Sequence, residues 1–279
     1  DAVVGLRGNT DAVAVFDGIG DGTLAGARFF GPARFASDLE LGDLDGDGDL
    51  DAVLSTVGGP TFGDPVATVL FNDGLGAFSG TQDHVFVPNV PFSYGTMLAV
   101  GDVDGDGDLD LVGSARPNVT AVTLLRGRGD GTFDPAEPAL SGLWAPMALA
   151  LHDVDGDGDS DLAVYDGLFP HPRVVLAAND GSGSFVTVQA LELGGRTSFE
   201  EARRAMEFGD LDGDGAQDLV ASNAFAVGTP VGLRPLIRAP FGFETALVDF
   251  DGDGRLDALT ATRDAGFNGL VAVCLNRTP

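Results

Sequence analysis

Short apolar runs separated by polar, glycine-rich segments recur along the whole chain. Thr96–Gly101 is such a run before an aspartate-rich segment, and Asp51–Leu54 is one directly after another. Further runs, such as Val174–Ala178, lead into a turn of the type Asn179-Asp180-Gly181. Runs of this length, rich in β-branched residues and bounded by turn residues, are typical of β-strands, and Asn-Asp-Gly supplies the positive φ angles that hairpins need. The pattern therefore predicts an all-β protein.

Each repeating unit is predicted to contain four antiparallel strands, here called A to D. The aspartate-rich loop joins A to B, and the glycine turn joins C to D. The spacing of the loops, 59, 51, 57 and 39 residues, indicates a β-propeller of four-stranded blades. We expect one domain over 1–279 with six blades, or seven or eight if the chain continues. The expected units are 1–34, 35–91, 92–143, 144–196, 197–240 and 241–279.

The first and last units are expected to be incomplete. Residues 1–4 align with Asp51–Leu54, so Asp1 takes the last position of a sixth loop, and the last unit stops after its C strand. The 39-residue spacing suggests that the fifth unit lacks a D strand. One short helix is expected at 198–204, which opens with a Ser-x-x-Glu capping box.

The motif Asp-x-Asp-Gly-Asp-Gly-x-x-Asp occurs five times, once in each A–B loop. Side-chain oxygens at positions 1, 3, 5 and 9, with a backbone carbonyl at position 7, form a hard, charged donor set that suits Ca²⁺. The glycines at positions 4 and 6 permit the left-handed backbone of a tight loop. We therefore expect about five Ca²⁺ ions, held by Asp43, Asp45, Asp47, Asp49 and Asp51; Asp102, Asp104, Asp106, Asp108 and Asp110; Asp153, Asp155, Asp157, Asp159 and Asp161; Asp210, Asp212, Asp214, Ala216 and Asp218; and Asp249, Asp251, Asp253, Arg255 and Asp257.

The net charge of −28 is concentrated in these loops, which hold 23 of the 43 acidic residues. The acidity therefore reflects metal binding, and without a basic face nucleic-acid binding is not expected. No apolar stretch is long enough to enter a membrane. All 15 basic residues are arginine, which indicates a bacterial source, and loops of modest Ca²⁺ affinity work best outside the cell. A secreted or cell-surface location is expected.

The loop Leu41–Asp51 resembles the FG-GAP repeats of the integrin α-subunit propeller. Together with turns such as Asn72–Phe78, it is also similar to bacterial VCBS-type repeat proteins. The resemblance covers nearly the whole chain. It implies a calcium-stabilised propeller in an extracellular protein that serves in adhesion, glycan binding or scaffolding.

Ligand binding is expected at the end of the sheets opposite the aspartate loops, because the B–C loops and D–A connections there differ from unit to unit. The residues chosen as ligand-face candidates are Trp144, Tyr94, Tyr165, His171 and Arg173. They favour a glycan or an extracellular protein as partner. Two alternatives stay open: a self-assembling surface layer or filament joined through an open blade edge, and a polysaccharide lyase or hydrolase. No catalytic constellation is evident among three histidines, two tyrosines and no lysine, so an enzyme is not expected.

Overall fold

The computed structural model describes residues 1–6, 13–31, 36–56, 66–86, 96–115, 120–167, 172–193, 206–221, 224–229, 233–234, 237–238, 244–263, 269–274 and 276. Every regular element in these ranges is a β-strand, and none of them contains a helix able to span a membrane. The predicted helix at 198–204 lies outside the described residues. The chain divides into two compact units, Asp1–Gly142 and Leu143–Pro279, next to the predicted boundary at 143.

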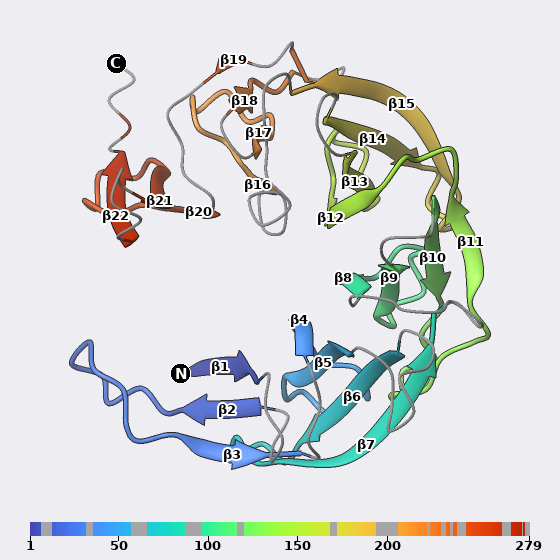
Figure 1. The fold of residues 1–279 in the computed structure, drawn as a ribbon, viewed down its shortest axis with the longest axis vertical. Helices are drawn as coiled ribbons and strands as arrows, with labels where there is room; N and C mark the ends of the chain where they lie inside the picture. Colours follow the sequence, from blue (N-terminus) through green and yellow to red (C-terminus); the bar gives the residue numbers. More distant parts are fainter. Residues whose placement is uncertain are drawn as a thin grey trace. The chain divides into compact units, whose positions relative to one another are not determined.

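The first unit holds three antiparallel sheets whose strands follow chain order (Figure 1). They consist of β1 (Ala2–Gly5), β2 (Val13–Phe16) and β3 (Arg28–Phe30); of β4 (Ala36–Gly42), β5 (Asp51–Thr56), β6 (Val66–Asn72) and β7 (Phe78–Val85); and of β8 (Thr96–Gly101), β9 (Asp110–Ala115), β10 (Val122–Leu125) and β11 (Glu137–Leu140).

The second unit repeats this organisation with three further antiparallel sheets (Figure 1). They consist of β12 (Pro146–His152), β13 (Asp161–Asp166), β14 (Arg173–Asn179) and β15 (Phe185–Glu192); of β16 (Met206–Gly209), β17 (Asp218–Ala221), β18 (Ala224–Ala226) and β19 (Ile237–Arg238); and of β20 (Glu244–Val248), β21 (Asp257–Arg263) and β22 (Gly269–Cys274).

The predicted order A-B-C-D is confirmed, with the aspartate loops between A and B. The first sheet carries B, C and D and the last carries A, B and C, as expected from the alignment of Asp1. Asp1 Oδ1 accepts a hydrogen bond from Gly18 N at 2.6 Å, the contact that the last position of a loop makes elsewhere. The prediction that the fifth unit lacks a D strand is wrong. Its two-residue strand β19 pairs with β18, and short strands explain the close spacing.

The core lies between successive sheets of each unit. In the fourth sheet, strands B (β13) and C (β14) are buried along almost their whole length, which explains why their sequences are continuous apolar runs. The D strands β7 and β15 are largely exposed. Leu44, at the second loop position, is buried in a cluster with Leu98, Leu111, Leu125 and Phe133 of the following sheet. The aspartate loops thus contribute to packing as well as to polar chemistry.

Backbone segments approach closely where the C–D turn meets the A–B loop. Gly131 N donates to Leu44 O at 2.8 Å, which joins the turn of one sheet to the loop of the preceding sheet. Within a sheet, Gly127 lies so close to the loop that an added Cβ would overlap the Leu109 carbonyl group. The group that the Cβ would overlap is backbone and cannot rotate away, so the turn of this sheet would have to shift to admit a side chain at this position.

We predict that Gly127→Ala lowers the free energy of unfolding by about 2–3 kcal/mol, the usual cost of overpacking. Gly26→Ala is the matched control, because a Cβ at Gly26 meets nothing within 4 Å. Chemical denaturation of both variants measures the difference. Equal stability of the two variants would contradict the close approach of turn and loop.

Candidate metal centres and ligand surface

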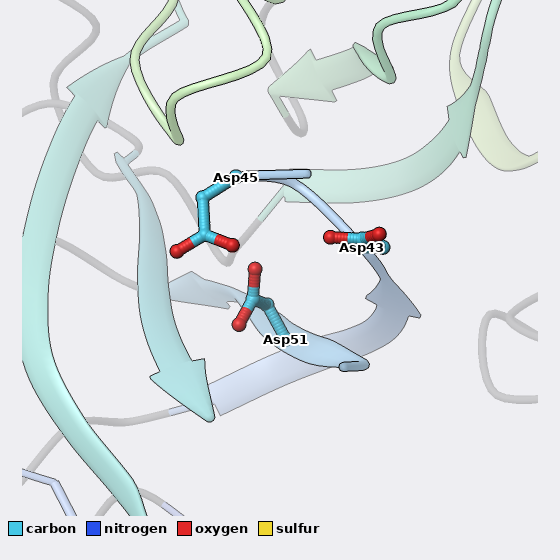
Figure 2. A group of neighbouring side chains, drawn as sticks. All are labelled: Asp43, Asp45 and Asp51. Carbon is cyan, nitrogen blue, oxygen red and sulfur yellow. The ribbon is translucent and has the colours of Figure 1, made fainter. Parts of the chain in front are cut away.

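Three carboxylates come together in each of the five aspartate loops. Positions 1, 3 and 9 of every motif offer one oxygen each, and these oxygens lie within 4.8 Å of one another. Figure 2 shows the first cluster, in which Asp45 and Asp51 point toward one another and Asp43 lies beside them. The clusters are Asp43, Asp45 and Asp51; Asp102, Asp104 and Asp110; Asp153, Asp155 and Asp161; Asp210, Asp212 and Asp218; and Asp249, Asp251 and Asp257.

The first aspartate of each motif shapes its loop through the two glycines. In the first loop Asp43 Oδ1 accepts from Gly46 N at 2.9 Å and Oδ2 accepts from Gly48 N at 3.0 Å. The other four loops repeat both bonds. The glycines adopt φ angles of 74° and 93°, which other residues rarely adopt. The carboxylate is therefore held in place before any ligand binds.

The fifth and seventh positions lie outside these three-membered clusters. The fifth aspartate accepts a hydrogen bond from the backbone N of the seventh residue, for example Asp47 Oδ1 from Asp49 N at 2.9 Å. The same bond forms where the seventh residue is Ala216 or Arg255. Because this bond uses only the backbone N–H of the seventh residue, it places no demand on the side chain at that position.

The ninth aspartate is buried and links the A–B loop to the C–D turn. Asp51, Asp110, Asp161, Asp218 and Asp257 are each at most 4% exposed. Asp110 Oδ2 accepts from Val103 N in the loop at 2.9 Å, and its Oδ1 accepts from Gly127 N at the C–D turn at 2.7 Å. The other four loops form the equivalent pair of bonds. One side chain thus fixes the loop to the turn.

Burial makes this aspartate difficult to ionise. It raises the pKa of Asp110 to about 6, against the two backbone hydrogen bonds that lower it; Asp104 and Asp106 add repulsion. Burial likewise raises the pKa of Asp51, Asp161 and Asp218. A carboxylate crowded by like charges and removed from water is stabilised by a bound cation.

The donor set fits Ca²⁺. All side-chain donors in the clusters are carboxylate oxygens, which hard cations prefer and which Zn²⁺ sites seldom use alone. In the second loop Asp104 Oδ1 is buried without a hydrogen-bond partner, while Asp104 Oδ2 pairs with Arg126. A buried oxygen left without a donor is costly unless a cation meets it. Positions 1, 3 and 9 would hold the ion.

The opposite end of the fourth sheet carries a second arrangement of charged and aromatic groups. Asp166, at the end of β13, is fully buried. Its Oδ2 accepts from Arg173 Nε at 3.0 Å and Nη2 at 2.8 Å. Its Oδ1 accepts from the backbone N of Trp144 and of Ala145, both at 2.8 Å. Arg173 lies over the Trp144 ring, 4.1 Å from its centroid, so the indole is fixed on one side while the residue stays 52% exposed.

Of the five ligand-face candidates, the structure thus brings Trp144 and Arg173 together. The prediction for Tyr165 is wrong: it is 0% exposed and belongs to the core cluster between the fourth and fifth sheets, on a strand whose residues are all buried. Tyr94 and His171 lie outside the described residues.

Two residues that hold the two ends of the fourth sheet, Asp166 and Asn179, were not identified as such from the sequence. Asp166 was not singled out, although an aspartate directly after an apolar B strand was a visible signal. Asn179 was read only as a turn residue. Its Nδ2 donates to Ser160 O at 3.0 Å and its Oδ1 accepts from Gly183 N at 3.0 Å, so it ties the turn to the loop.

Comparisons with known proteins agree with this fold. Residues 102–164, which span the second and third loops, match the FG-GAP-like repeat family. The resemblance to FG-GAP propeller proteins is thereby confirmed for this part of the chain. No sequence among the curated proteins matches.

Three solved structures are similar along nearly the whole chain. A lectin from Agrocybe aegerita that recognises non-reducing terminal N-acetylglucosamine is 20% identical, with a TM-score of 0.57 over 96% of this chain and 76% of the lectin. Rhamnogalacturonan lyase YesW is 14% identical, with a TM-score of 0.55 over 98% of this chain and 58% of the lyase. A Bacillus licheniformis rhamnogalacturonan lyase is 15% identical, with a TM-score of 0.54 over 97% and 58%. The chain spans little more than half of each lyase. At these identities the likeness shows the fold alone, and it confirms the predicted all-β propeller fold.

We predict that Asp110→Asn lowers the free energy of unfolding by about 2 kcal/mol, because an amide offers one acceptor where two backbone N–H groups need one each. Asp108→Ala is the control, since the fourth loop has Ala216 at the same position. Denaturant titration in calcium compares the two. An Asp110→Asn protein as stable as Asp108→Ala would contradict the role of the ninth aspartate as a clamp.

We also predict that the metal-free protein becomes less stable as the pH rises from about 4.5 to 7. A folded-state pKa near 6 for Asp110 lies above its ordinary value of 3.8, so the stability that this group contributes is present at low pH and is lost as the pH passes through 6. Hydrogen bonds from Thr132 lower the pKa of Asp130, which acts in the opposite direction but below pH 4. Burial lowers the pKa of His84, which opposes the trend inside this range, whereas burial raises the pKa of Asp51, Asp161, Asp218 and Glu207 and adds to the trend. Melting temperatures in chelator over this pH range test the sign, and Asp110→Asn should flatten the curve. A metal-free melting temperature that rises over this range would contradict the prediction.

Proposed function

We propose that this protein is a calcium-binding extracellular β-propeller that acts as a binding or scaffold module for glycan ligands, with the chain 1–279 forming one domain. The observation that carries the proposal is the repetition of a three-carboxylate cluster at the same place in five sheets. A single acidic turn has many explanations, whereas five equal donor sets, each with its ninth aspartate buried, point to a cation. The FG-GAP-like match over residues 102–164 supports the same assignment.

Each loop is proposed to hold one Ca²⁺ through positions 1, 3 and 9, with the fifth side chain and the seventh carbonyl completing the coordination. The ion would neutralise carboxylates that repel one another and lock the A–B loop against the C–D turn. Such loops are saturated where calcium is millimolar, and FG-GAP repeats are typical of extracellular proteins, which supports a secreted or surface location.

The glycan ligand is proposed on two grounds. The exposed Trp144 ring, held by Arg173 and Asp166, is a rigid aromatic surface of the kind that recognition sites use. In addition, the similar structures include a lectin and polysaccharide lyases. An extracellular protein ligand and assembly of copies through an open blade edge remain as outcomes of the test.

A polysaccharide lyase is the second candidate, favoured by the likeness to two rhamnogalacturonan lyases. Two of the three histidines are engaged in packing. His84 meets Phe133 edge-on at 4.9 Å, and His152 stacks on Phe208 at 5.1 Å. The remaining histidine, His171, lies outside the described residues. The binding module is the better supported function because both described imidazoles pack against aromatic rings.

We predict that chelator lowers the melting temperature by more than about 10 °C and that millimolar Ca²⁺ restores it, since each ion stabilises the folded state by mass action. A melting temperature that does not respond to chelator would refute the metal assignment.

The calcium-loaded protein should also co-sediment with at least one of a set of insoluble polysaccharides without releasing unsaturated products, and Trp144→Ala should weaken that binding. Steady product release would favour the lyase, and binding to protein but no polysaccharide would replace the glycan.

A further inference from the structure

A cavity of about 670 Å³ opens between the fourth and fifth sheets of the second unit, beside the third aspartate loop. Its volume falls in the range of small-molecule sites. Asp155 and Asp161, two of the three carboxylates of the third cluster, lie on one wall. Arg234 and Leu233, from the C–D segment of the fifth sheet, lie on the other. The cavity is thus distinct from the Trp144 surface at the opposite end of the fourth sheet.

The third aspartate loop is less covered than the second because of a difference at one residue. In the second loop Arg126, the residue before the C–D turn, pairs with Asp104 at position 3 and with Glu137 of strand D. The corresponding residue of the third loop is Ala178, which lines the cavity together with Asp155. The correspondence follows from the next residues, since Gly127 N and Asn179 N each donate to the ninth aspartate of their loop. The third loop therefore lacks the cover that the second has.

The two walls of the cavity are held at a fixed separation. Gln189 of β15 donates from Nε2 to Leu233 O at 2.7 Å and accepts at Oε1 from Leu233 N at 3.3 Å. This paired amide contact joins a side chain of the fourth sheet to backbone of the fifth. Leu233 is buried in the core cluster between these sheets, so the wall that carries Arg234 is anchored. The Leu233 wall of the cavity is therefore packed against the fourth sheet.

The lining combines two chemistries in one space. Leu176, Val188 and Leu233 provide apolar surface, while aspartates and a guanidinium provide acceptors and donors. A sugar ring matches this combination, because its C–H groups suit the apolar wall and each hydroxyl can both donate to a carboxylate and accept from arginine. We propose that this cavity binds one neutral sugar unit of a glycan, with Asp155 and Arg234 fixing its hydroxyl groups.

Charge decides between a neutral and an acidic sugar. The third loop carries five aspartates, so about three negative charges remain after one divalent ion binds, against one positive charge on Arg234. A carboxylate at about 4 Å from each unbalanced charge would be repelled by about 1–4 kcal/mol. Hydroxyl groups avoid this repulsion. The calcium ion would also hold Asp155 in place, so sugar affinity is expected to depend on calcium, and in this respect the inference rests on the proposed function.

The test is ligand-observed NMR on the calcium-loaded protein with four neutral probes, N-acetylglucosamine and the methyl glycosides of galactose, mannose and rhamnose, and with galacturonate as the acidic probe. At least one neutral sugar should bind, and more tightly than galacturonate. Ala178→Phe, which installs the residue found at the same place in the first loop (Phe71), should abolish binding. Arg234→Gln, at an exposed side chain, should weaken binding about tenfold, whereas Arg128→Gln, at an exposed arginine of the third sheet that pairs with Asp134, should leave it unchanged.

The controls separate this inference from the proposed function. Calcium-dependent melting of each variant shows that it folds and binds its ions, and the exposed Arg234→Gln gives an answer even if Ala178→Phe fails to fold. Three results would overturn the sugar site while leaving the calcium module intact. They are no detectable binding of any of the four neutral sugars, tighter binding of galacturonate than of the neutral sugars, and binding that persists in both cavity variants. Loss of the calcium-dependent melting shift in the unmodified protein would instead overturn the proposed function.

Discussion

The structure depends on one buried side chain, the ninth aspartate of each loop motif. Its two oxygens accept backbone N–H groups from the A–B loop and from the C–D turn, as Asp110 does with Val103 and Gly127. Without such an acceptor, both N–H groups would be left unpaired in the interior, which is costly. Every sheet with a complete motif uses the same device, and Asp1 retains its bond to Gly18 in the first sheet.

This device creates the condition that favours a cation. Burial raises the pKa of the same aspartate, and the first and third aspartates place further negative charge within 4.8 Å. The fold thus needs the carboxylate as a hydrogen-bond acceptor but makes its charge unfavourable. A divalent ion would resolve the conflict, because it would stabilise the ionised form that accepts two bonds best. The carboxylate of the ninth aspartate is therefore both the structural clamp and part of the proposed metal site.

The sequence predicted what local patterns determine. Strands A to D, the loops between A and B, and the alignment of Asp1 follow from apolar runs, glycine turns and a repeated motif. Side-chain environments set by packing between sheets could not be read in this way. Tyr165 belongs to an apolar run, and its burial follows from the packing of the fourth sheet, in which every residue of β13 is buried. Similarly, nothing local in the sequence indicates that Asp166 pairs with Arg173, since the bond depends on the register of β13 with β14.

A uniform clamp leaves the neighbouring position free to differ between sheets. The residue before the C–D turn precedes the backbone donor to the ninth aspartate in the second to fifth sheets, yet it is Phe71, Arg126, Ala178 or Val227. Phe71 packs against the core between the second and third sheets, and Arg126 pairs with the third-position aspartate. Ala178 leaves that aspartate facing a cavity. Because the hydrogen bonds to the ninth aspartate use only backbone N–H groups, they tolerate each of these side chains. The same constraint that makes the loops alike thus leaves room at one of them for the proposed sugar site.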